Sequence, residues 1–303
     1  MPASIYSLAP AKLGATVVPI KSLTVSPAII SEQDVHSGNP YPTLIRVSGA
    51  APKVTISMPF GPAFAALGFG VTKLTIFEVW LAKFLDFTRD AGATHAKFAL
   101  TGSSVAAAMI TGISVDQDGD LMASVDVVPI ADTSFTNPLA MTSGALPTLA
   151  SQPLLYTLGP CTLNGTLIPG LTSAGADLAQ QLVQQRTDGS KYTMAAVRVG
   201  ATPRAFAEHA DPATFIGTLT LDGIAASSNF VQYFRSYDAT TGVVSNAASS
   251  ACSLTMAVGR AHPTDLSVSQ GGVAKIGVEF FPTSSTSTHP IVVSTSATVP
   301  TVS

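Results

Sequence analysis

Tyr6-Ser7-Leu8-Ala9-Pro10 returns 150 positions later as Tyr156-Thr157-Leu158-Gly159-Pro160, and this repetition decides how the 303-residue chain is organised. Three further identities share the register: Leu13 with Leu163, Thr16 with Thr166, and Pro19 with Pro169. A period of this length far exceeds the roughly 20 to 50 residues of a solenoid repeat. The sequence therefore predicts one whole domain that is written twice.

The register drifts slowly along the rest of the chain, as small insertions in loops would cause. The spacing becomes 151 for Gly38 with Gly189, Tyr41 with Tyr192, and Lys53 with Arg204, and 153 for Val125 with Val278, Asp126 with Glu279, and Pro129 with Pro282. Domains of about 150 residues can bury a core without disulfides or metals. We predict a first copy over residues 1–140 and a second copy over residues 141–303.

The composition indicates a weakly charged surface. Charged residues make up 11% of the chain, against roughly 25% in ordinary soluble domains. Depletion of charge is typical of surfaces buried between subunits, so we expect self-association. The net charge is −3 and the isoelectric point about 5.9, whereas nucleic-acid-binding domains are strongly basic. Such a surface suits DNA that passes without specific binding, since like charges repel.

Two cysteines, Cys161 and Cys252, both fall in the second copy, and Ala11 occupies the first-copy position that matches Cys161. A disulfide would not belong to the shared framework, so we expect two free, buried thiols in a reducing compartment. The sequence Met1-Pro2-Ala3-Ser4 has none of the features of a secretory signal, which favours assembly in the cytoplasm.

The uncharged stretch Val54–Thr72 approaches the length of a membrane span. Pro59 and Pro62 interrupt it, and the matching stretch of the second copy is charged. We therefore expect a buried or partner-covered region of strand and loop there, and no membrane contact.

The periodicity of the apolar residues predicts a mainly β chain with one helix in each copy. Short runs rich in Val, Ile and Thr read as strands. Trp80, Phe84 and Phe87 fall at i, i+4 and i+7, which predicts a helix over Glu78–Asp90. The second copy repeats the stripe with Phe230, Phe234 and Tyr237 behind the capping residues Ser228 and Asn229. The predicted fold is two tandem homologous β-sandwich or barrel domains, each with one flanking α-helix.

Other segments give weaker signals. Asp116-Gln117-Asp118-Gly119-Asp120 lies between two strand-like runs and predicts a hairpin, repeated around Gln270-Gly271-Gly272. Helix-forming residues over Ala176–Arg186 suggest a further helix. The Ser/Thr-rich stretches Ala131–Pro153 and Thr283–Ser303 could be disordered linkers or extended arms that reach a neighbour, and their apolar residues favour arms.

A search for chemistry finds no catalytic constellation. The five histidines, namely His36, His95, His209, His262 and His289, show no metal-ligand spacing. Asp116, Asp118 and Asp120 resemble the start of a calcium loop, but Leu121 and Val127 stand where that loop needs Gly and Glu. Glycine motifs for a dinucleotide or an activated serine are incomplete. We predict no enzyme, no cofactor, no metal site and no catalytic residue.

The plan of each copy resembles tail tube proteins of long-tailed bacteriophages. The segments that carry the likeness run from Leu158-Gly159-Pro160 through Leu163-Asn164-Gly165-Thr166 to Thr187-Asp188-Gly189-Ser190-Lys191-Tyr192, with a weaker version from Leu8-Ala9-Pro10 to His36-Ser37-Gly38-Asn39-Pro40-Tyr41. It covers most of both halves but contains no diagnostic motif. The resemblance implies β-sandwich or barrel domains, six of which form a ring around a DNA channel.

A variant with two tube domains per chain would make the ring from three chains, which is a trimeric, pseudo-hexameric arrangement. The resemblance further implies a structural protein of the virion tail, assembled in the bacterial cytoplasm, that contacts itself, a tape-measure protein and other tail proteins. DNA would pass through the lumen during ejection. Asp116, Asp118 and Asp120 are candidates for lumen or ring–ring positions. Alternatives are a distal-tail or baseplate hub ring, a capsid decoration protein, and a carbohydrate-binding tandem sandwich.

Overall fold

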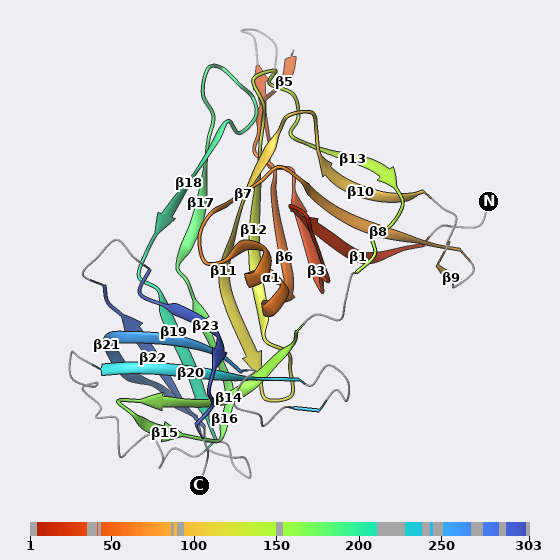
Figure 1. Ribbon diagram of the computed structural model, residues 1–303. Helices are drawn as coiled ribbons and strands as arrows, with labels where there is room; N and C mark the ends of the chain where they lie inside the picture. The colour runs from red at the N-terminus through yellow and green to blue at the C-terminus, as the bar shows by residue number, and fades with distance from the viewer. Residues whose placement is uncertain are drawn as a thin grey trace.

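The computed structural model describes residues 5–34, 41, 44–85, 88–89, 94–149, 154–210, 228–237, 243–244, 251–267, 275–284 and 289–300. Antiparallel strands dominate these residues, and α1 (Phe60–Leu67) is the one helix within them. The mainly β prediction is confirmed. The strands form one six-stranded sheet, one 13-stranded sheet and two separate hairpins (Figure 1).

The six-stranded sheet belongs to the first half of the chain, in the order β13-β10-β8-β1-β2, with β9 beside β8. Its strands are β1 (Ile5–Leu13), β2 (Thr16–Val18), β8 (Phe77–Leu85), β9 (Thr88–Arg89), β10 (His95–Leu100) and β13 (Leu139–Gly144). The 13-stranded sheet begins in the same half with the order β3-β6-β12-β11, and β7 pairs with β11. These strands are β3 (Ser22–Ser26), β6 (Lys53–Pro59), β7 (Thr72–Leu74), β11 (Val105–Asp116) and β12 (Met122–Ile130).

The same large sheet continues through the second half in the order β16-β19-β22-β21-β20-β14-β15, with β23 beside β21. Its strands are β14 (Tyr156–Leu163), β15 (Thr166–Ile168), β16 (Leu171–Asp177), β19 (Arg204–His209), β20 (Ser228–Ser236), β21 (Ala251–Ser267), β22 (Lys275–Pro282) and β23 (Val292–Ala297). The long β21 pairs with β20 and β23 near its start and with β22 near its end. It therefore connects two layers that are separate sheets in the first half.

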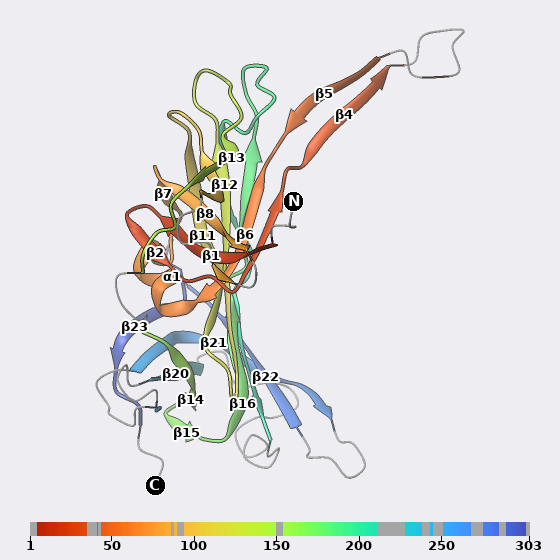
Figure 2. The same ribbon diagram turned by 90° about the vertical axis from the view of Figure 1, so that its right-hand side faces the viewer.

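Two hairpins complete the fold. The first consists of β4 (Ile29–Asp34) and β5 (Leu44–Ala50), and the second of β17 (Gln180–Gln185) and β18 (Ala195–Gly200). Figure 2 shows β4 and β5 extending away from the body of the molecule, whereas Figure 1 shows β17 and β18 alongside it.

The main core lies between the layers. In β6 the residues alternate between buried and half-buried, as expected for a strand with one covered face. Val54 and Ile56 from β6 join Ala11 and Leu13 from β1 in one apolar cluster that extends into both halves. The helix α1 closes one end of the first half, with Phe60 fully buried and its ring stacked on Phe64 at 5.6 Å.

The repeated Tyr-x-Leu-x-Pro motif marks the same irregularity in both halves. The pairing of β1 with β8 shifts register between Leu8 and Ala11, and the pairing of β14 with β20 shifts between Leu158 and Cys161. Proline has no N–H for the ladder and is tolerated at bulges. The identical spacing of the prolines therefore has a structural cause.

The predicted helices over Glu78–Asp90 and behind Ser228 are wrong, because residues 78–85 belong to strand β8 and residues 228–236 form strand β20. Phe87 of the predicted stripe lies outside the described residues. An i, i+4 spacing also satisfies the two-residue period of a strand. Phe230 and Phe234 accordingly lie on one face of β20, in the main core. In β8 both faces are apolar: Val79 enters the main core, and Trp80 packs with Ala82 and Phe84 on the other side.

The remaining expectations have mixed outcomes. The hairpin around Asp116–Asp120 is confirmed by the pairing of β11 with β12. The turn at Gln270-Gly271-Gly272 lies outside the described residues, although β21 and β22 on either side of it do pair. The helix over Ala176–Arg186 is wrong, since this segment ends β16 and forms β17.

The Ser/Thr-rich stretches contribute strands to their own chain. Within Ala131–Pro153, β13 pairs with β10, and within Thr283–Ser303, β23 pairs with β21. One helix, α1, lies in the first half at a position that was not predicted. The stretch of the second half that matches it begins at residue 211 and lies outside the described residues.

Candidate functional site

Three of the histidines that the structure describes contact neighbouring residues in the strands. His95 is buried, and its Nδ1 accepts a hydrogen bond of 2.9 Å from the Lys83 amide. His209 is buried against the Pro169 carbonyl, and His262 stacks on Phe281 with ring centres 5.0 Å apart. His36 lies outside the described residues. Among the described residues, His, Cys, Asp and Glu form no group that could hold a metal ion.

Both cysteines are free thiols with no access to solvent. Cys161 and Cys252 are each 0% exposed. Burial raises the pKa of each thiol to about 12, so both are protonated at neutral pH. Protonated, buried thiols are poor nucleophiles. The stretch Val54–Thr72 forms β6, α1 and the start of β7, and no helix in the described part of the chain is long and apolar enough to span a bilayer.

The three aspartates of the β11–β12 turn lie near the boundary between the halves. Asp120 forms an ion pair of 2.9 Å with Lys21. Asp116 and Asp118 line an open cleft together with Glu208 and Lys275, which pair with each other at 2.8 Å. The Lys275 ammonium, followed by a hydrogen bond from Thr172, holds the pKa of Glu208 below its usual value. The location of these aspartates in a lumen or between rings stays a prediction.

The two halves meet through a direct strand pairing. Residues 112–116 of β11 run antiparallel to residues 173–177 of β16, with Val115 opposite Ala174 (Figure 1). The pairing requires small residues on β16. A Cβ on Gly175 would lie 2.4 Å from the Ile113 carbonyl oxygen and 2.5 Å from the Phe206 ring. We call this β11–β16 pairing the joint.

The second hairpin reinforces the joint by packing across the first half. Leu182 of β17 is buried against Ala107, Met109 and Val128 on β11 and β12. The Gln184 amide donates to the backbone carbonyls of Ala51 and Pro52 at 3.3 and 2.9 Å.

Beyond the hairpin, the backbone itself continues the contact. The Ala50 amide donates to the Lys191 carbonyl at 2.6 Å, and Ala50 bridges Tyr192. The two halves are therefore held together by backbone hydrogen bonds between strands, by an apolar cluster, and by hydrogen bonds from a side-chain amide.

The pattern of strand pairing in the first half recurs in the second. The order β3-β6-β12-β11 corresponds to β16-β19-β22-β21, and the order β2-β1-β8-β10-β13 to β15-β14-β20-β21-β23. Local details recur as well. An ion pair of 2.6 Å joins Lys53 to Asp126, and another of 2.6 Å joins Arg204 to Glu279. Ala28 before β4 has φ 40°, and Ala179 before β17 has φ 47°.

This correspondence relates the joint to two open strand edges. β16 corresponds to β3, which pairs only with β6 in the described structure. The joint segment of β11 corresponds to the end of β21, whose residues 263–267 pair only with β22 among the residues placed here. The side chains of Ser22, Thr24 and Ser26 on β3 are exposed. Within the described part of the chain, β3 and the end of β21 are thus open edges of the two kinds that pair with each other in the joint.

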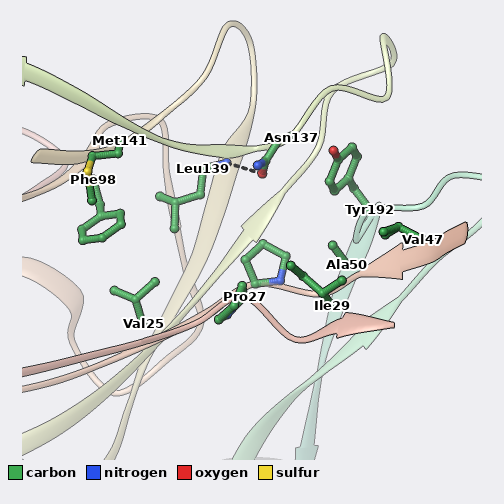
Figure 3. A pocket seen from close by; sticks show the side chains of 11 residues that line it. Val25, Pro27, Ile29, Val47, Ala50, Phe98, Asn137, Leu139, Met141 and Tyr192 are labelled. Atoms are coloured by element: carbon green, nitrogen blue, oxygen red, sulfur yellow. Dashed lines mark hydrogen bonds between the residues drawn. The ribbon is translucent and has the colours of Figure 1, made fainter. Parts of the chain in front are cut away.

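An apolar pocket of about 260 Å³ lies at the base of the β4–β5 hairpin (Figure 3). Its lining comprises Val25, Pro27, Ile29, Val47, Ala50, Pro52, Phe98, Asn137, Leu139, Met141 and Tyr192. In the second half, Ala176 and Leu178 stand at the positions of Val25 and Pro27 and are each 1% exposed. The same region is therefore buried in the second half and open in the first.

No protein-family model matches this sequence, and no curated protein matches it. The joint and the two open edges are the features of the molecule that bear on its function. Sequence reasoning missed both. The alternation in Ser22-Leu23-Thr24-Val25-Ser26 and the small residues Ala174-Gly175-Ala176 were the signals that could have indicated them.

Proposed function

We propose that this protein is a structural subunit whose chains join end to end into a closed ring of three, with six similar domains around a central channel. Stacked rings of this kind would form the tail tube of a long-tailed bacteriophage, through which DNA passes. The observation that carries the proposal is the joint, together with the matching open edges at the two ends of the chain.

The two open edges favour a head-to-tail assembly. They differ from each other, so they would generate a heterologous contact, which yields a ring when the rotation closes and a filament when it does not. In the joint, Ser114 lies opposite Gly175. The corresponding residues at the open edges are Ser267 on β21 and Thr24 on β3. Pairing them would also remove exposed strand edges, which otherwise promote uncontrolled aggregation.

The sheet face away from the core suits a channel that does not bind DNA. Three of its basic residues form ion pairs with neighbours: Lys53 with Asp126, Arg204 with Glu279, and Lys275 with Glu208. Ser57, Thr111, Ser114 and Ser124 supply small polar side chains on the same surface. Paired charges offer few contacts to a phosphate backbone, whose binding depends on unpaired Lys and Arg.

Mass measurement and electron microscopy of the purified protein test the proposal. We expect closed rings of three chains with near-sixfold symmetry, and hollow tubes at high concentration. Rings that never stack would favour a distal-tail or baseplate hub role, and spikes on capsids would indicate a decoration protein. Particles that remain monomeric at all concentrations and bind glycans would contradict the proposal.

A further inference from the structure

The β4–β5 hairpin exposes an apolar face. Ile29, Ile45 and Val47 are 61%, 65% and 55% exposed, respectively. Val47 lies opposite Ser31 and Ile45 opposite Gln33, so these side chains share the face of β4 that carries Ile29. An apolar surface on a projecting hairpin is a typical site of protein–protein contact.

The β17–β18 hairpin is the counterpart of β4–β5 at a spacing of 151. Gln33 opposite Ile45 on the first hairpin matches Gln184 opposite Ala196 on the second. Both hairpins follow an alanine with positive φ. Leu182 lies on the face of β17 that corresponds to the exposed face of β4. This face of β17 is buried against β11 and β12. The covered hairpin therefore shows how the open one could be covered.

The corresponding receiving surface in the second half lies on β21 and β22. At a spacing of 153, Arg260, His262 and Phe281 match Ala107, Met109 and Val128, the three residues that bury Leu182. Arg260 is exposed and lies opposite Phe281. The His262 and Phe281 rings stack at 5.0 Å, and the His262 side chain is 40% exposed. The β4–β5 hairpin is a sheet of its own, and Figure 2 shows it projecting at the top of the view, whereas β21 and β22 lie in the lower half of the molecule. A single chain cannot bring them together.

We propose that the β4–β5 hairpin of one chain lies across β21 and β22 of the next chain and recognises a second copy of this protein. Ile45 and Val47 cover the stacked rings of His262 and Phe281. The Gln33 amide donates to the backbone carbonyls of residues 202 and 203, as Gln184 does to Ala51 and Pro52 inside the chain. This inference rests on the proposed ring and names the surface that selects the partner.

A photo-crosslinker tests the contact directly. p-Benzoylphenylalanine is placed at position 45, rings of the full chain are verified by mass, and the adduct is mapped by peptide mass spectrometry. We expect the crosslink to join two chains and to map to β21 or β22. Rings that form normally but crosslink elsewhere would overturn this inference and leave the ring intact. Absence of rings in the wild-type protein would overturn both.

A charge on the same face gives a second test. Ile45→Lys should raise the dissociation constant of the ring on the order of a hundredfold, because an ammonium would be buried beside Arg260, a like charge opposite Phe281. Ile45 is 65% exposed in the single chain, so folding should be unaffected. Val197→Lys is the matched control, since Val197 is 44% exposed on the β18 face that points away from β11 and β12. Equal ring stability in the two variants would overturn the inference.

Discussion

Gly175→Ala should weaken the joint more than its single added methyl group suggests. The new Cβ would lie 2.4 Å from the Ile113 carbonyl oxygen and 2.5 Å from Phe206 Cζ. The ring could rotate away, but the carbonyl belongs to the partner strand and moves only if the two strands separate. Overpacking in a filled site costs roughly 1–3 kcal/mol. Because a backbone atom is involved, we expect a loss of about 3 kcal/mol in the free energy of unfolding, at the upper end of that range.

Chemical denaturation of Gly175→Ala and of a matched variant measures this effect. Gly200→Ala is the control, because no atom lies within 4 Å of its added Cβ and its φ is not positive. We expect the control to match the wild type within about 0.5 kcal/mol, as surface substitutions usually do. Equal stability of the two variants would refute the steric role assigned to the joint, whereas a selective loss in Gly175→Ala would support it.

Three further outcomes follow from burial and charge. Phe234→Asp places a carboxylate at a fully buried position and should unfold the domain, abolishing assembly; a wild-type melting curve would refute the core assignment. Cys161 and Cys252 have pKa values raised to about 12 by burial, so a thiol reagent at pH 8 should label them only after denaturation; rapid labelling of the folded protein would contradict their burial. The pKa of Glu208 is lowered chiefly by Lys275. The ionised carboxylate therefore stabilises the fold fully above its ordinary pKa of 4.5. This stabilisation is lost as the pH falls through the lower pKa that Glu208 has in the folded protein. Lys275→Ala should flatten the acid limb of the Tm–pH curve, and an unchanged limb would show that the pair contributes nothing.

The sequence predicted the class of the fold because strand-forming residues and turn chemistry are local signals. The turn at Asp116–Asp120 could be predicted from its own residues and from the strand-like sequences on either side of it. The repeat of Tyr6–Pro10 at Tyr156–Pro160 was also readable, and it marks a bulge of the same kind in β1 and β14.

The helices failed for a physical reason. β8 is apolar on both faces, since Val79 enters the main core and Trp80 packs on the other side. A strand covered on both faces loses its alternation, and the spacing of Trp80 and Phe84 then fits a helix equally well. Phe230 and Phe234 were ambiguous for the same spacing reason. Tertiary pairing, which periodicity does not report, decided both cases.

The joint could not be read from the sequence because its partners are far apart in the chain. Val115 lies opposite Ala174. Neither segment contains a local pattern that indicates the other as its pairing partner. The exposure of Ile45 and Val47 was equally hidden, since an apolar strand residue is normally expected in a core. Only the contrast between two corresponding hairpins, one covered and one open, identifies this surface.

Disulfide trapping across the open edges tests whether β3 of one chain pairs with β21 of the next. Thr24 on β3 and Ser267 on β21 correspond to Gly175 and Ser114, which lie opposite each other in the joint. Directly opposed residues in antiparallel strands have Cα atoms roughly 4.5–5.5 Å apart, within disulfide reach. The native thiols are buried and should not compete.

The double variant Thr24→Cys, Ser267→Cys is oxidised and run on a denaturing gel, with Thr24→Cys, Thr264→Cys as the control. We expect a ladder of crosslinked chains that ends at three for the first pair and no crosslink for the control. A ladder that continues past three would indicate an open filament. Equal crosslinking of both pairs, or none in either, would contradict the proposed edge-to-edge ring.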